Sequence, residues 1–161
     1  MSDILFKTDD FIFSYRVAAI IIYDGKVLLQ KCINDSSFAF PGGHVAFGET
    51  NEETLIRELK EETGADIIVK DLKWVGETFF SWDDRDCHQI CLYYIAEFSI
   101  NPKIPLNGRF IGKEFFEEKT FEIEFFWIPL DTLNDLLVYP ETAKELIHCL
   151  NDGVKHFISK E

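Results

Sequence analysis

Short apolar stretches separated by turn-forming residues dominate the first third of the chain. Residues 13–23 are rich in β-branched and aromatic side chains, and residues 26–31 resume the pattern after Asp24-Gly25. An Asp-Gly pair between two such runs is typical of a tight hairpin turn. Residues 38–40 form a third apolar run, which ends at Pro41-Gly42-Gly43 because proline cannot donate a ladder hydrogen bond. This segment predicts a β-hairpin, a short strand and a turn.

Helical spacing replaces alternation between residues 50 and 63. Three aliphatic side chains there lie at helical spacing: Leu55, Ile56 and Leu59. Thr50 stands just before this pattern and Glu53 follows it by three residues, which is the spacing of a capping box. Gly64 comes directly after the pattern, where glycine commonly ends a helix. The sequence predicts one helix with both ends defined.

Strand patterns dominate the second half of the chain, and helical patterns return near its end. Strands are predicted over residues 67–69, 74–82, 90–98 and 121–128, with a turn over 83–86 and a loop over 101–112. Helices are predicted over residues 129–138 and 141–158. Strands on both sides of one central helix are typical of helices packed on a mixed sheet. We therefore expect an α/β fold with a sandwich architecture.

The length and composition are those of one folded domain with an acidic exterior. The 161 residues are 47% hydrophobic, which excludes a disordered chain and predicts a single domain over 1–161. The 16 basic and 29 acidic residues give a formal net charge of −13. This charge repels phosphate backbones and anionic lipid, so we expect no non-specific nucleic-acid binding and no membrane binding. An anionic substrate would need bound metal cations or a local basic patch.

From the first residues given, we expect no secretory signal peptide. Its first residues lack a basic segment followed by a long apolar stretch, and the longest apolar run, residues 17–22, is too short to cross a bilayer. We expect a cytoplasmic protein with reduced, mostly buried cysteines, namely Cys32, Cys87, Cys91 and Cys149. The sequence does not decide the oligomeric state, and a homodimer is compatible with it.

The predicted helix carries an unusual cluster of negative charge. Glu58, Glu61 and Glu62 are spaced i, i+3 and i+4, so their carboxylates share one face. Like charges at this spacing destabilise a helix unless a cation lies between them. Oxygen-rich clusters suit hard cations such as Mg²⁺ or Mn²⁺. The alternative, a solvated acidic face, is the better interpretation for an ordinary Glu-rich helix.

Residues around the helix extend this cluster. A backbone carbonyl of the preceding turn, that of Gly42, is a candidate ligand for the same ion. Arg57 falls on the opposite flank, one turn from Glu61, and Glu49 lies just ahead of the helix. Because arginine pairs with carboxylates through a planar fork, we expect Glu49 to hold the Arg57 guanidinium in place.

The stretch from Gly43 to Ala65 resembles the Nudix box, written Gx5ExxxxxxxREUxEExGU with U a bulky aliphatic residue. Its letters are matched by Gly43, Glu49, Arg57, Glu58, Leu59, Glu61, Glu62 and Gly64. Only the last place departs, where Ala65 replaces a larger aliphatic side chain. The resemblance extends over the order of elements from about residue 13 to residue 150, which is the core of the domain. It implies an α/β/α sandwich with a mixed sheet, in which the box forms a loop-helix-loop.

The resemblance also implies a reaction and its residues. Nudix enzymes hydrolyse a nucleoside diphosphate linked to another group, using a metal-activated water. Glu58, Glu61 and Glu62 would bind Mg²⁺, or Mn²⁺ in its place, with the Gly42 carbonyl as an extra ligand. Glu58 is the candidate base, and Arg57 with Glu49 would orient the carboxylates. A further carboxylate often comes from a later loop, and the candidates here are Glu114, Glu117, Glu118 and Glu122.

The substrate class is open. The proline typical of ADP-ribose hydrolases is absent from the window at residues 79–81, and the markers for dinucleoside polyphosphates, NADH and coenzyme A are absent too. The chain therefore resembles the MutT-like subgroup, which acts on small-molecule nucleotides. Trp82, beside a polar turn, is the aromatic side chain expected to be most exposed, and it and His44 are the candidate substrate contacts. Alternatives are a catalytically silent nucleotide sensor, an ADP-ribose or nucleotide-sugar pyrophosphatase, and an isopentenyl diphosphate isomerase.

Overall fold

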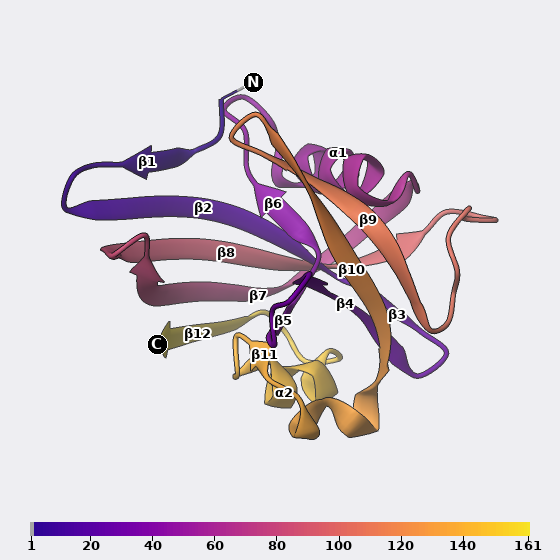
Figure 1. The fold of residues 1–161 in the computed structure, drawn as a ribbon. Helices are drawn as coiled ribbons and strands as arrows, with labels where there is room; N and C mark the ends of the chain where they lie inside the picture. Colours follow the sequence, from indigo (N-terminus) through magenta and orange to yellow (C-terminus); the bar gives the residue numbers. More distant parts are fainter. Residues whose placement is uncertain (1) are drawn as a thin grey trace.

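Two mixed β-sheets form the body of the protein in a computed structural model that describes residues 2–161 (Figure 1). The first sheet contains β1 (Leu5–Lys7), β2 (Phe11–Ile20), β8 (Arg85–Phe98), β7 (Ile67–Trp82) and β12 (Lys155–Lys160) in that order, and β6 (Gly42–His44) pairs with β2. The second contains β11 (Val138–Tyr139), β5 (Phe38–Ala39), β4 (Lys26–Cys32), β10 (Lys119–Pro129) and β9 (Arg109–Phe116), and β3 (Ile22–Tyr23) pairs with β4. Parallel pairs (β2–β8, β7–β12, β5–β11) occur beside antiparallel ones.

Helical segments lie on opposite sides of these sheets (Figure 1). The long helix α1 (Asn51–Thr63) covers one side. The short segments cover the other, namely η1 (Leu130–Asp135), α2 (Ala143–Leu146) and η2 (Ile147–Cys149). The predicted α/β sandwich is therefore confirmed. None of these helices is long and apolar enough to cross a membrane.

Two clusters of buried side chains hold the layers together. One contains Leu55 and Leu59 of α1, both 0% exposed, packed with Val17 of β2 and Phe125 of β10. The other lies on the side of the short helices and includes Trp74. Each aliphatic side chain buried in this way contributes about 1.5–3 kcal/mol to folding. The first cluster fixes the position of α1, and with it the position of the acidic face.

Turn chemistry explains the hairpins. Asp24 and Gly25 have φ of 51° and 71°, which suits the two-residue turn between β3 and β4 that the sequence predicts. Asp83 and Asp84 have φ of 51° and 59° and join β7 to β8. The predicted four-residue turn over 83–86 is thus shorter, because Arg85 already pairs with Trp82.

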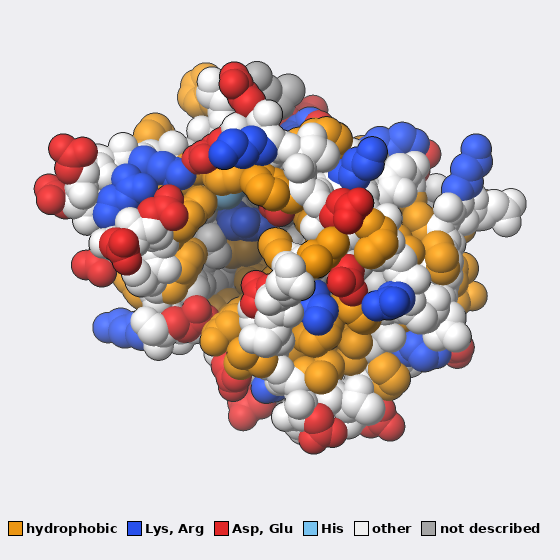
Figure 2. Space-filling model, viewed as in Figure 1, with side chains coloured by type: hydrophobic (Ala, Val, Ile, Leu, Met, Phe, Trp, Pro, Cys, Tyr) orange, Lys and Arg blue, Asp and Glu red, His pale blue; other side chains and the backbone are white. Residues whose placement is uncertain are grey.

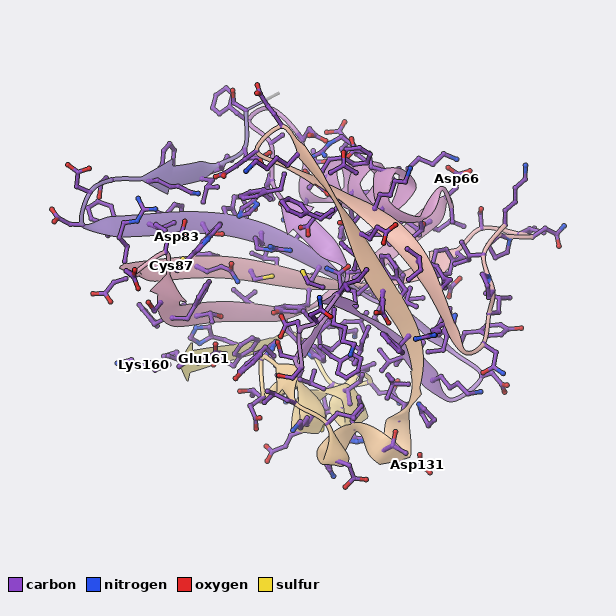
Figure 3. All side chains as sticks on the ribbon, viewed as in Figure 1. Asp66, Asp83, Cys87, Asp131, Lys160 and Glu161 are labelled. Atoms are coloured by element: carbon purple, nitrogen blue, oxygen red, sulfur yellow. The ribbon has the colours of Figure 1, made fainter. Side chains whose placement is uncertain are left out.

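The predicted helix over residues 141–158 is wrong. Helical structure ends at Cys149, and residues 155–160 form β12, which pairs in parallel with β7. Lys160 and Glu161 lie at the end of this strand (Figure 3). Phe157 is buried and Ile158 exposed, the alternation of an edge strand with one face on the core. A Cβ atom on Gly76 would lie 2.4 Å from the Phe157 ring, so the glycine admits this side chain.

Two other predictions need correction. The loop predicted over 101–112 ends earlier, because β9 begins at Arg109 and pairs with β10. The helix predicted over 129–138 is the shorter 3-10 segment η1. The four cysteines form no disulfide: Cys87 and Cys91 are buried as predicted, whereas Cys32 and Cys149 are exposed.

Candidate functional site

Local signals place α1 as the sequence predicts. The Thr50 side chain accepts a hydrogen bond from the Glu53 amide (3.2 Å), and the Glu53 carboxylate accepts one from the Thr50 amide (2.8 Å). Gly64 ends the helix in the left-handed region, with φ of 77°. Because both ends and the buried face are fixed, the three glutamates of the acidic face have defined positions.

Arg57 connects three carboxylates. Its Nε lies 3.0 and 3.1 Å from the two oxygens of Glu49, which confirms the predicted pair. Its Nη1 lies 2.9 Å from Glu58 Oε1 and 3.4 Å from Glu61 Oε2. Burial lowers the pKa of Arg57, but the hydrogen bonds and charges of Glu49 and Glu58 outweigh it and raise that pKa further. A charged guanidinium therefore contacts Glu49 through Nε, and Glu58 and Glu61 through Nη1.

Glu58 packs against the backbone of β6. A Cβ atom on Gly43 would lie 2.3 Å from the Glu58 carboxyl carbon, so only glycine leaves room for this carboxylate. Burial raises the pKa of Glu58 to about 7, although the neighbouring Arg57 charge opposes the shift. The adjacent Gly42 lies against the Val17 carbonyl, where a Cβ atom would come within 2.0 Å. The glycine pair therefore lets β6 approach both β2 and the helix.

Replacing Gly43 by alanine is accordingly expected to displace Glu58. We expect at least about a 10-fold loss of hydrolytic activity, because small displacements of a reacting group are costly. Initial rates in the presence of Mg²⁺ would measure this. Gly153→Ala is the matched control, since nothing lies within 4 Å of a Cβ atom there. Full activity in Gly43→Ala would contradict the contact as a positioning feature.

Glu62 is the most deeply buried of the helix carboxylates. It is 4% exposed, and its Oε2 atom has no hydrogen-bond partner. Burial, together with the charges of Glu58 and Glu114, raises its pKa well above the ordinary value. Gly112 of β9 lies against the Glu62 carbonyl, where a Cβ atom would come within 2.4 Å. An unpaired buried carboxylate oxygen is unfavourable unless a cation or donor reaches it.

The donor set fits a hard divalent cation. Among residues 2–161, no three acidic, histidine or cysteine side chains already converge on one point that could hold a metal ion. Glu61 in particular is 41% exposed and reaches toward Arg57. Burial nevertheless disfavours the ionised forms of Glu58 and Glu62, and a bound cation would stabilise them. Oxygen ligands of this kind suit Mg²⁺ or Mn²⁺.

Stability without metal should depend on pH. Since the pKa of Glu58 is about 7 in the folded protein and near 4.5 when unfolded, the folded state keeps a proton that the unfolded state releases. We therefore expect the free energy of unfolding in chelator to fall as pH rises from about 4.5 to 7, by up to about 3 kcal/mol. Thermal unfolding in EDTA would measure this. Saturating Mg²⁺ should reduce the slope, and a melting temperature that rises over this range would contradict the prediction.

Of the four carboxylates predicted as further ligands, Glu114 lies near the helix carboxylates. Glu114 of β9 is close enough to raise the pKa of Glu62, and it lines a neighbouring cavity. Glu117 pairs instead with Lys7, and Glu118 lies exposed in the β9–β10 turn. Glu122 is exposed on β10. The structure thus separates four candidates that the sequence left equal.

A cavity of about 320 Å³ opens next to these residues, between strands of the two sheets. Figure 2 shows the molecule hollowed over β2 and β8, beneath the tip of the β9–β10 hairpin, with hydrophobic side chains around the opening. Arg16 of β2 lines the cavity, and no carboxylate within residues 2–161 forms a salt bridge with it. Arg16 was not among the site residues predicted from the sequence; its signal was a basic residue alternating with Ser14 and Ala18 in an apolar strand.

Trp82 and His44 lie at the end of β7 and in β6, outside the lining of this cavity. The expectation that Trp82 is exposed is wrong: it is half-buried, with its ring 6.0 Å from those of His44 and Phe116. Lys7 Nζ lies 4.8 Å from the Trp82 ring. Burial, with the charges of Arg16 and Lys7, lowers the pKa of His44 to about 3, so its ring is neutral.

Comparison with known proteins finds one matching family and several relatives of known name. The family described as the NUDIX domain matches residues 14–149. The chain is 44% identical over 86 residues to the ADP-ribose pyrophosphatase of Methanocaldococcus jannaschii, covering 50% of this chain and 48% of that protein. It is 32% identical over 123 residues to the putative mutator protein MutT4 of Mycobacterium tuberculosis, covering 72% and 45%. The chain therefore spans about half the length of these curated relatives.

A solved structure shares the fold. The MutT protein from Methanosarcina mazei Go1 matches with a TM-score of 0.57 and 19% identity, over 90% of this chain and 96% of that chain. At this identity the likeness concerns the fold alone.

Proposed function

Because the chain belongs to the NUDIX family, we propose that it is a metal-dependent hydrolase that cleaves the diphosphate linkage of a nucleoside diphosphate derivative. The observation that carries the proposal is the unpaired, buried Glu62 oxygen beside Glu58, next to the unpaired Arg16 guanidinium of the cavity. An unpaired carboxylate oxygen close to a guanidinium that pairs with no carboxylate suits a metal–diphosphate ligand.

The residues of the box have different proposed roles in metal binding, proton transfer and orientation. Glu58, Glu61 and Glu62, with the Gly42 carbonyl, would hold Mg²⁺ or Mn²⁺, and Glu114 is the further carboxylate. Such an ion supplies polarisation of the phosphoryl oxygens and a more acidic water. Glu58 is the candidate base that takes the proton of the attacking water. Arg57, braced by Glu49, orients the carboxylates, and Arg16 binds phosphate oxygens.

The substrate is a small-molecule nucleotide whose identity needs a direct test. The M. jannaschii relative is named an ADP-ribose pyrophosphatase and the M. tuberculosis one a mutator protein, so both ADP-ribose and nucleoside triphosphates belong in the panel. The panel also includes oxidised (d)NTPs, nucleotide sugars, dinucleoside polyphosphates and capped RNA, each with excess Mg²⁺. The Glu62→Gln variant runs beside the wild type.

One compound hydrolysed far faster than the others, with loss in Glu62→Gln, would establish the activity and name the substrate. Absence of turnover across the panel, with nucleotide binding seen by calorimetry, would overturn the hydrolase in favour of a nucleotide sensor.

A further inference from the structure

The hairpin formed by β9 and β10 projects beyond the core. Gly112 of β9 and Ile123 of β10 are its last buried pair. Between them and the turn every side chain is exposed except those of Glu114 and Phe116, which are half-buried. Figure 1 shows the tip reaching the side of the molecule where the N-terminal segment and β6 lie. A two-stranded ribbon is only marginally stable by itself, so the position of the tip depends on its contacts.

Glu114 lies between two anchored positions of the inner face of β9. Gly112, Glu114 and Phe116 alternate along the strand and therefore share that face. Gly112 packs against the backbone of α1. The Phe116 ring lies in an aromatic cluster, with its centroid 5.7 Å from that of His44 and 6.0 Å from that of Trp82. The position of Glu114 relative to the helix carboxylates therefore depends on where Phe116 is held.

Lys7 of β1 connects this tip to the rest of the molecule. Its Nζ atom lies 4.8 Å from the centroid of the Trp82 ring and 5.6 Å from that of Phe116. The same ammonium group forms a salt bridge with Glu117 in the turn. The Lys7 side chain is 25% exposed, and partial removal from solvent strengthens the attraction of a cation to aromatic rings. One side chain thus contacts two consecutive residues of the hairpin tip.

The segment that carries Lys7 is also joined to the loop that leads into α1. The Ile4 amide donates a hydrogen bond to the Val45 carbonyl (2.8 Å), and the Phe47 amide donates one to the Ser2 carbonyl (2.8 Å). This N-terminal segment therefore connects the loop before the acidic helix to the tip of the hairpin.

We propose that Lys7 is a positioning residue that holds Glu114 beside the helix carboxylates, acting through Phe116 and Glu117 of the hairpin tip. The inference rests on the proposed function, in which Glu114 is the further carboxylate of the metal site. It gives a residue far outside the box an influence on the affinity for the metal ion.

A double-mutant cycle on metal affinity tests this assignment. The probe is Mn²⁺ alone, without nucleotide, and the EPR signal of the free ion gives Kd. The variants are Lys7→Met, Glu114→Gln and the two together, each checked for folding by circular dichroism. Lys31→Met is the matched control, because its Nζ atom also lies near two rings, 5.5 Å from the centroid of Phe38 and 5.4 Å from that of Phe126.

We expect Lys7→Met to raise the Kd for Mn²⁺ about 10-fold, the effect typical of a residue that supports a metal ligand. In the Glu114→Gln background the same change should alter Kd by less than about 2-fold, because the carboxylate that Lys7 positions is gone. Lys7→Arg should bind Mn²⁺ like the wild type, since a guanidinium also stacks on aromatic rings and pairs with a carboxylate. Lys31→Met should match the wild type.

The direction of the change separates position from charge. Removing a positive charge near the site would by itself favour a cation, so charge alone predicts tighter binding in Lys7→Met, whereas loss of position predicts weaker binding. Unchanged or tighter binding in folded Lys7→Met would overturn the assignment. An equal loss with and without the Glu114 carboxylate would also overturn it, because a general change of structure would then explain the effect.

The two proposals fail in different ways. If the wild type hydrolyses nucleotides while Lys7→Met keeps the wild-type Kd for Mn²⁺, only the positioning role fails. If Lys7→Met weakens Mn²⁺ binding in a Glu114-dependent manner but the wild type hydrolyses nothing in the panel, the hydrolase fails and the positioning role stands.

Discussion

Replacing Glu62 by glutamine is expected to lower kcat by about 100-fold or more while raising the melting temperature of the metal-free protein. The activity falls because the variant loses a negative metal ligand. Mutation of a residue that only supports a metal ligand already lowers metal affinity or activity by about 10–100-fold. The stability rises because the native carboxylate is buried, its Oε2 atom is unpaired and its pKa is raised well above normal by burial. The amide has the same shape without the cost of burying charge.

Steady-state kinetics on the best substrate and thermal unfolding in EDTA measure the two effects. A gain of 1 kcal/mol would raise the melting temperature by about 2–4 °C in a domain of this size. Glu118→Gln, the same chemical change in the exposed β9–β10 turn, should alter neither quantity. A variant that loses both activity and stability would instead give Glu62 a structural role.

Replacing Arg57 by methionine should reduce activity and stability together. The Arg57 side chain is 24% exposed and contacts Glu49, Glu58 and Glu61, so its removal leaves two largely buried carboxylates, Glu49 and Glu58, without this counterion. We expect a loss of about 3 kcal/mol in the free energy of unfolding, as when one partner of a buried ion pair is removed. Activity should fall as well, because Glu58 would lose the contact that orients it.

Urea unfolding at neutral pH without metal gives the stability change. Lys60→Met, in the same helix, breaks an exposed pair with Asp66 and should cost less than about 1 kcal/mol. Arg57→Lys should keep the charge but not the planar group that reaches Glu49 through Nε and Glu58 through Nη1, so its activity should stay below that of the wild type. Equal losses of stability in Arg57→Met and Lys60→Met would contradict a stabilising role for the contacts of Arg57 with the three glutamates.

The helix α1 could be predicted because its determinants are local. Thr50 and Glu53 form the capping box, Gly64 takes the left-handed conformation, and Leu55 and Leu59 face the core. The helical pattern over residues 141–158, which rests on Leu146 and Leu150, was a weaker guide. It produced only short helical turns, because residues after Gly153 gain more by pairing with β7, and this partner is distant in the sequence.

The candidate site also combines residues that are close in the sequence with residues that only the fold brings together. The carboxylates of the box and Arg57 lie in one continuous stretch, so sequence spacing predicted one face for Glu58, Glu61 and Glu62 and the flank for Arg57. Arg16, Gln30 and Gln89 come together only because β2, β4 and β8 meet around the cavity. Nothing in the local sequence marks Gln30 as buried, because the residues that cover it come from the other sheet.

The cavity takes its walls from both sheets, with Gln89 on the first and Gln30 on the second. A molecule bound there is a noncovalent cross-link between two layers of the fold, and its affinity adds to the native state's resistance to opening. Amide hydrogen exchange in β4 and β8 should therefore slow together as a ligand is titrated. Exchange protection shared by these two strands would identify compounds that occupy the cavity even before an assay for their turnover exists.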